Sequence, residues 1–219
     1  MRPHGSRERI LGRLNAQRSG QEEASTAAIP PLRRFEWAPE ERQARLEAAL
    51  RAAHAEVYPV RDDWPALLAR RLQALAVTGL RYGAGSPLAS ELCRGWPAEA
   101  LPLLRQNTPI ERNREELFDA ADASITSCRA GIAETGSLVL WPTPAEPRLL
   151  SLVPPVHCVL LEAESIVSTL HELMVAEQWS SGMPTNAVLI SGPSKSADIE
   201  QTLAYGVHGP ARLIVLVRA

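Results

Sequence analysis

Hydrophobic and polar positions follow a helical period in the first part of the chain. In residues 39–54 (PEERQARLEAALRAAH), Leu46, Ala49, Leu50 and Ala53 recur on one side, and the first turn carries a proline and two acids. Proline fits the first turn of a helix, and acidic side chains favour its positive N-terminus. The pattern therefore predicts an amphipathic helix over residues 39–54.

The next segments extend this helical part. Residues 57–60 (VYPV) favour a short strand, and residues 63–75 predict a second helix that is followed by the Gly-rich turn GLRYGAGS. The side chains expected to face inward from this second helix are Leu67, Leu68, Leu72 and Leu75.

The N-terminal segment has its own pattern. The stretch RERILGRLNAQRSG places Ile10, Leu11 and Leu14 at helical spacing, and a polar, Ala-rich stretch follows. We expect a short helix on a flexible linker over residues 1–30, and one folded domain over residues 31–219.

Short β-prone runs dominate after residue 120. These runs are ASIT, GIAET, SLVLWP, HCVLLE, NAVLIS and RLIVLV. Two helices are expected between the later runs, over residues 165–179 and 197–205. Strands that alternate with helices predict an α/β fold, and runs that are apolar at every position are typical of strands covered on both faces. We expect a layered α/β fold with a largely parallel sheet and helices on both of its faces.

The loop over residues 191–198 (SGPSKSAD) combines turn-forming residues with hydroxyl and charged side chains. A loop that leaves the carboxyl end of a buried strand and enters a helix is where open α/β sheets place their ligands. Glycine permits close backbone approach, and hydroxyls, a lysine and free helix-start amides suit an anion such as a phosphate or carboxylate. The alternative is that Ser196 or Asp198 simply caps the helix. The candidate ligand-binding residues of this loop are Ser191, Gly192, Ser194, Lys195, Ser196 and Asp198.

Composition and charge narrow the function classes. The formal net charge of the 219 residues is −2, and the sequence pI is about 6.2. This balance argues against nucleic-acid binding, which needs a basic surface. The longest uninterrupted aliphatic run is too short to span a bilayer, so we expect a cytoplasmic protein without a membrane span.

The three cysteines, Cys93, Cys128 and Cys158, are far apart and form no C-x-x-C arrangement. One chain of this kind cannot assemble a tetrathiolate iron–sulfur cluster or a structural zinc site from them. No pairing of histidines with acids has the spacing of a metal site either. We therefore expect no metal and no cofactor in this chain.

Three ordered blocks of the sequence identify a related family. The blocks ISGPSKSADIEQTLAYGVHGP, IAETGSLVL and LSLVPPVHCVLLE closely resemble the lactate utilization protein C family, which is built on the LUD domain. The resemblance covers about residues 118–219, and LRYGAGSPL and RERILGRL fit more loosely.

The resemblance implies a fold like that of glucosamine-6-phosphate deaminases, ribose-5-phosphate isomerases and coenzyme A transferases. It also implies a role in oxidising L-lactate to pyruvate beside companion proteins that carry iron–sulfur clusters. Members of the family carry a small residue and an acid shortly before the IAETG block, where this chain has Cys128 and Arg129. Acid chemistry at that position is therefore not expected here.

Two residues are candidates for catalysis. In the related coenzyme A transferases, a glutamate in a strand-to-turn setting like that of Glu134 is the nucleophile; the alternative is a turn carboxylate bonded to nearby amides. His157 follows two prolines and precedes an apolar strand, and its imidazole is suited to act as a general base. A backbone hydrogen bond at the strand entrance would equally explain it. The turn residues expected to contact a ligand beside Glu134 are Thr135, Gly136 and Ser137.

His208 is expected at the C-terminus of the helix over residues 197–205, where an imidazolium suits the helix dipole. It is also a candidate contact to the ligand.

The leading hypothesis is an accessory or ligand-binding LUD-domain subunit of a system that oxidises L-lactate to pyruvate, with a small anionic ligand bound at residues 191–198. Its expected partners are the iron–sulfur proteins of lactate oxidation. One alternative is a stand-alone enzyme that acts on a phosphosugar or a coenzyme A thioester, with Glu134 as base or nucleophile. Another is a scaffold whose N-terminal helix recruits the cluster-bearing partners.

Overall fold

The structure is a computed structural model that describes residues 6–19, 34–106, 122–197 and 203–219. The chain divides into two compact units, residues 1–34 and residues 35–219. The described part of the first unit is helix α1 (Ser6–Ser19), on which Ile10, Leu11 and Leu14 are exposed. The expected N-terminal helix is therefore present.

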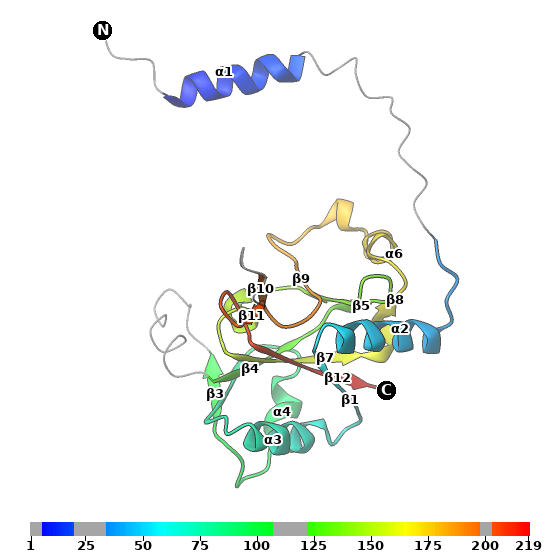
Figure 1. Cartoon of the computed structure of the whole chain (residues 1–219), viewed down its shortest axis with the longest axis vertical. Helices are drawn as coiled ribbons and strands as arrows, with labels where there is room; N and C mark the ends of the chain where they lie inside the picture. Colours follow the sequence, from blue (N-terminus) through cyan, green and yellow to red (C-terminus); the bar gives the residue numbers. More distant parts are fainter. Residues whose placement is uncertain (1–5, 20–33, 107–121, 198–202) are drawn as a thin grey trace. The chain divides into compact units, whose positions relative to one another are not determined.

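The second unit is built on a six-stranded sheet (Figure 1). Its strand order is β1-β12-β7-β4-β2-β3, and every neighbouring pair is parallel. The strands are β1 (Glu56–Val60), β2 (Leu80–Gly83), β3 (Leu103–Gln106), β4 (Ala123–Ser127), β7 (Val156–Glu162) and β12 (Arg212–Arg218). The predicted parallel sheet is confirmed.

Helices cover both faces of this sheet (Figure 1). Helices α3 (Trp64–Ala74) and α4 (Ala89–Gly95) share one hydrophobic core with Ile214 and Leu216 of β12, whereas α2 (Pro39–Ala52) packs on the other face. Because successive side chains of a strand point to opposite faces, a strand covered on both sides must be apolar at every position. This is why the run RLIVLV is apolar at successive positions instead of alternating between apolar and polar residues.

A smaller four-stranded sheet packs on the same face as α2 and shares its hydrophobic core. Its order is β8-β5-β6-β9, in which only β5 and β8 are parallel. The strands are β5 (Ala130–Ile132), β6 (Ser137–Leu140), β8 (Ile166–Val167) and β9 (Val188–Ile190). Strand β9, which precedes the loop of interest, is therefore an edge strand of this small sheet and not a member of the parallel one.

The helix predicted over residues 165–179 is shorter in the structure. Helix α6 spans Leu170–Ala176, because residues 166 and 167 pair with β5 as strand β8. Short 3-10 turns stand on either side, Ala163–Ser165 and Trp179–Ser181, and a third spans Arg148–Ser151. The Ser165 boundary was wrong because strand pairing with a distant segment outweighed helical propensity.

The beginning of α6 is set by two side-chain hydrogen bonds. The hydroxyl of Thr169 accepts a hydrogen bond from the backbone N–H of Glu172 at 3.1 Å, and the Glu172 carboxylate accepts one from the N–H of Ser168 at 2.8 Å. The first bond satisfies an N–H group that a helix start otherwise leaves without a partner, and the second ties the residue before the cap to the first turn of the helix.

Replacing Thr169 with alanine is expected to lower the free energy of unfolding by about 1 kcal/mol, because one capping bond is lost. Chemical denaturation measures this change. Thr169→Ser is the matched control, since serine keeps the capping hydroxyl. Equal stability of the alanine and serine variants would contradict the assignment of the cap.

The prediction of a helix over residues 197–205 is wrong for the part of this segment that the structure describes. Strand β10 (Lys195–Ala197) pairs antiparallel with β11 (Leu203–Tyr205), and Asp198 lies outside the described residues. The N–H of Ser194 also donates to Pro210 O, and the N–H of Gly206 to Ser194 O. Backbone pairing between the two arms of this segment has overridden a helical sequence pattern.

Candidate functional site

The loop after β9 does not have the setting that the sequence predicted for it. It leaves an antiparallel edge strand and enters β10, so among the described residues no helix start offers free amides there. Gly192 makes a close approach to helix α2 instead: its φ is +149°, and a Cβ there would lie 2.9 Å from the Cβ of Ala53. The loop is therefore held against the end of α2.

A chain of hydroxyl groups joins this loop to the turn after β5. Ser137 Oγ lies 2.8 Å from Thr135 Oγ1 and 2.7 Å from Ser191 Oγ. Between the first two residues, Gly136 has a φ of +63° and packs against Ala49. Two segments that are 54 residues apart, and that the sequence assigned to one site, are thus in direct contact.

His157 is the second residue of β7 and is fully buried. Its Nε2 lies 2.9 Å from the hydroxyl of Thr126, whereas its Nδ1 has no hydrogen-bond partner among the residues that the structure describes. Burial lowers the pKa of His157 to about 3. The imidazole is therefore neutral at physiological pH and presents one unsatisfied nitrogen.

We call the pocket beside this residue the histidine pocket. Its volume is about 210 Å³, and most of its lining is apolar. Its polar lining residues are Ser151, His157, Ser191, Ser194 and His208, and Gly192 lies in the same wall. Small-molecule sites are typically apolar hollows with a few convergent polar groups, and those for drug-sized ligands measure roughly 300–1,000 Å³. This pocket suits a ligand of only a few heavy atoms.

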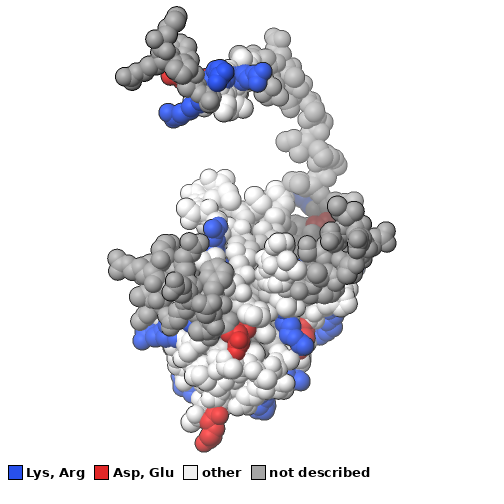
Figure 2. Space-filling view, turned by 60° about the vertical axis from the view of Figure 1, so that its left-hand side comes forward, with Lys and Arg blue, Asp and Glu red and all other residues white. Residues whose placement is uncertain are grey.

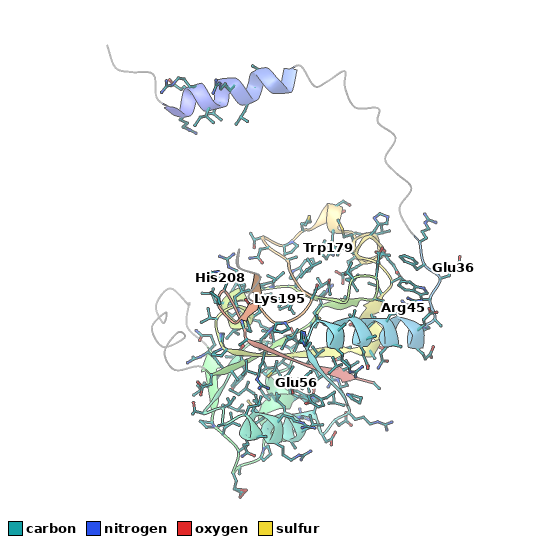
Figure 3. The ribbon with its side chains drawn as sticks, viewed as in Figure 1. Glu36, Arg45, Glu56, Trp179, Lys195 and His208 are labelled. Atoms are coloured by element: carbon teal, nitrogen blue, oxygen red, sulfur yellow. The ribbon has the colours of Figure 1, made fainter. Side chains whose placement is uncertain are left out.

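Lys195 and His208 both belong to the part of the chain around β10 and β11 (Figure 3). His208 is exposed and lies between β11 and β12, so its expected position at a helix C-terminus was wrong. Lys195 is exposed and lines an adjoining hollow of about 350 Å³ with residues 52–54 and 191–193. Ser196 lies in β10.

Glu134 stands on an exposed turn. Its backbone N–H donates to Ser168 O at 3.0 Å, and the residue lines neither the histidine pocket nor the Lys195 hollow. Its role as a nucleophile stays a prediction.

Sequence reasoning missed a second pocket, which we call the carboxyl-edge pocket. Its volume is about 420 Å³, and it lies where β4, β7 and β12 end. Its most buried polar residue is Glu146, at 7% exposure. Glu146 lies between two prolines in PTPAEP, a stretch without periodicity, so the only sequence signal was a lone acid in a turn.

Surface charge in the structure is mixed. On the face shown in Figure 2, Lys and Arg are scattered among Asp and Glu, and the coloured atoms form no continuous basic surface. Within the described ranges, no group of three or more His, Cys, Asp or Glu side chains is arranged to hold a metal ion. The helices of those ranges are also too short or too polar to cross a membrane.

Comparisons with known proteins agree on one family. Residues 43–217 match the family model of the LUD domain. An uncharacterized protein of Neisseria meningitidis serogroup B is 39% identical over 189 residues, which cover 82% of this chain and 78% of that protein.

Several other relatives carry the name lactate utilization protein C. The protein of an Exiguobacterium species is 33% identical over 69% of this chain, and that of Deinococcus radiodurans is 37% identical over 56% of it. The matched regions span 65% and 57% of the lengths of these two relatives.

The fold also matches a solved structure. The crystal structure of a DUF162 family protein from Deinococcus radiodurans superposes with a TM-score of 0.60 and 26% sequence identity. The match covers 84% of this chain and 99% of that one.

Proposed function

Because the chain belongs to the LUD domain family, we propose that it acts in lactate utilization as a subunit that binds a small ligand in the histidine pocket. The names of two relatives support the lactate role. As the sequence resemblance implies, its partners would be iron–sulfur proteins of lactate oxidation, and this chain would carry no cofactor of its own.

One observation carries the ligand-binding part of the proposal: the buried Nδ1 of His157 has no partner among the described residues, and His157 lies in the wall of the pocket. A buried polar atom without a hydrogen bond costs about 1–3 kcal/mol, so a ligand that satisfies it gains affinity. The hydroxyls of Ser191 and Ser194 line the same pocket and add further donors.

L-Lactate has the chemistry that this nitrogen requires. The Thr126 hydroxyl can donate to Nε2 or accept from it, so Nδ1 is either a donor or an acceptor. A 2-hydroxy acid offers a carboxylate that accepts and a hydroxyl that donates, and it therefore complements either tautomer. Pyruvate lacks the hydroxyl and complements only a protonated Nδ1.

In this proposal, Lys195 favours ligand binding through its charge and not through contact with the ligand. It lines the hollow next to the histidine pocket, and the backbone of Gly192 and Pro193 borders both. The positive charge of Lys195 favours an anion in the neighbouring pocket, but solvent screens this attraction because Lys195 is exposed. Lys195→Ala should therefore weaken binding less than a change at His157.

The test is thermal unfolding of the full chain with L-lactate and with pyruvate. A ligand at a hundredfold its Kd adds about 2.7 kcal/mol, which raises the Tm of a protein of this size by about 5–10 °C. We expect this rise with L-lactate in the wild type and its loss in His157→Gln. Stabilisation by L-lactate but not by pyruvate would identify Nδ1 as an acceptor.

His171→Gln is the matched control, because His171 is an exposed histidine on α6 that does not line the histidine pocket. It should respond to L-lactate as the wild type does. A wild type that neither compound stabilises, or a His157→Gln variant that keeps the full response, would overturn the proposal.

A further inference from the structure

The carboxyl-edge pocket lies at the end of the parallel sheet where α/β proteins commonly bind ligands. Ser127, Glu162 and Arg218, the last residues of β4, β7 and β12, all line it, and so does Leu88 at the start of α4. Its volume of about 420 Å³ falls within the range of roughly 300–1,000 Å³ that is typical of small-molecule sites. The histidine pocket, by contrast, includes His157 and Leu213 near the beginnings of β7 and β12.

Glu146 is held rigidly in this pocket. Its carboxylate accepts hydrogen bonds from the N–H of Ser127 at 2.9 Å and from the Ser127 hydroxyl at 2.5 Å. Its backbone N–H and C=O both bond to Thr143, which closes a tight turn. A carboxylate has about four acceptor positions, so the two bonds from Ser127 leave capacity for a ligand.

The Gly-rich segment that begins at Gly83, the last residue of β2, makes this placement possible. A Cβ on Gly83 would lie 2.3 Å from the carbonyl oxygen of Ala145 and 3.2 Å from the Cα of Glu146. Only a residue without a side chain lets the turn approach the sheet so closely. The GAGS motif thereby helps to position Glu146.

The charges of the pocket disfavour an anion. Its lining contains four glutamates and two arginines. Arg218 is bound to both Glu91 and Glu162, at 2.7 Å and 2.5 Å, and Arg129 is bound to Glu177 at 2.6 Å. Both guanidinium groups are thus already neutralised by carboxylates of the same lining, and no positive charge is left over for a phosphate.

The pocket also contains an aromatic side chain. Trp141 is half-buried in the lining, and its ring meets that of Trp179 edge-on, with centroids 5.2 Å apart. A large, rigid indole offers apolar area at low entropic cost. Carboxylates that accept hydrogen bonds beside an apolar ring complement a molecule with several hydroxyls on a carbon skeleton.

We propose that the carboxyl-edge pocket binds an uncharged, polyhydroxylated small molecule of the simple-sugar class, and that Glu146 accepts a hydrogen bond from one of its hydroxyls. This site is separate from the histidine pocket, and the inference does not rest on the proposed role in lactate utilization. Burial raises the pKa of Glu146, so its carboxylate is protonated, and weakened as an acceptor, at a higher pH than that of an exposed glutamate.

The experiment is an NMR titration of the full chain in which the backbone amide of Ser127 is followed, because this N–H donates directly to Glu146. D-Glucose and glucose 6-phosphate are the probes, since they differ only in the charged group. Glucose should shift the Ser127 amide with a millimolar Kd, and glucose 6-phosphate should bind at least about tenfold more weakly. An amide that does not respond to glucose, or one that responds as strongly to the phosphate, would overturn the inference.

Glu146→Gln tests the acceptor itself. The amide side chain has nearly the same shape but loses the charge, and a hydrogen bond to a charged group is stronger than one to a neutral group, so glucose affinity should fall about tenfold or more. Glu99→Gln is the control, because Glu99 is exposed and does not line the pocket. Unchanged glucose affinity in Glu146→Gln would refute the role of Glu146, and the wild-type titration decides the ligand class even if that variant does not fold.

Discussion

Lowering the pH from about 6.5 to about 4 is expected to destabilise the protein by about 3 kcal/mol through His157 alone. The imidazole is fully buried, and burial lowers its pKa to about 3, whereas an imidazole in an unfolded chain has a pKa of about 6.5. Between these values the unfolded state binds a proton that the folded state does not. The stabilising contribution is therefore complete above pH 6.5 and is lost as the pH falls toward 3.

Urea unfolding of the wild type and of His157→Gln at a series of pH values measures this effect. The wild type should lose up to about 1.4 kcal/mol more per pH unit than the variant across the window. Comparing the two slopes cancels the contributions of other titrating groups, which both proteins share. Hydrogen bonds from Thr78 lower the pKa of Asp122, so Asp122 also loses stabilising energy as the pH falls. Burial raises the pKa of Glu146, so Glu146 acts in the opposite direction. Identical slopes for the two proteins would mean that the folded state does not lower the pKa of His157.

Replacing Gly83 with alanine is expected to lower the free energy of unfolding by about 2–3 kcal/mol and to displace Glu146. The new methyl group would meet the backbone carbonyl of Ala145, which cannot rotate away as a flexible side chain could. Either the turn over residues 143–146 or strand β2 has to move. Chemical denaturation measures the loss of stability, and the amide signal of Ser127 reports the displaced carboxylate.

Gly182→Ala is the matched control for this change. A Cβ at Gly182 would have no heavy atom within 4 Å, and its backbone is extended with a φ of −167°. Its stability should stay within about 0.5 kcal/mol of the wild type. If Gly83→Ala were equally well tolerated, the close contact between the Gly-rich segment and the turn of Glu146 would be wrong.

The candidate site was partly predictable from sequence. His157 and residues 191–194 line one pocket, and Ser137 contacts Ser191 directly. Lys195, expected in the same site, lines the adjoining hollow instead. The position of a long side chain on a loop depends on packing that a local pattern does not encode.

Glu146 was not predictable because nothing near it in the sequence reveals its burial. Its carboxylate is bound by Ser127, 19 residues earlier, and its turn rests on Gly83, 63 residues earlier. Burial of an acid is decided by such distant partners, so the pKa and accessibility of Glu146 are tertiary properties.

The sequence by itself determined the six β-prone runs, the helices α2 and α3 and the parallel α/β class, because continuous apolar runs and helical periodicity are local consequences of burial. Only the tertiary structure decided that β9 is an antiparallel edge strand and that β10 and β11 replace a helix. Strand pairing is settled by hydrogen bonds between segments distant in sequence, and those bonds outweigh local preferences that differ by less than about 1 kcal/mol per residue.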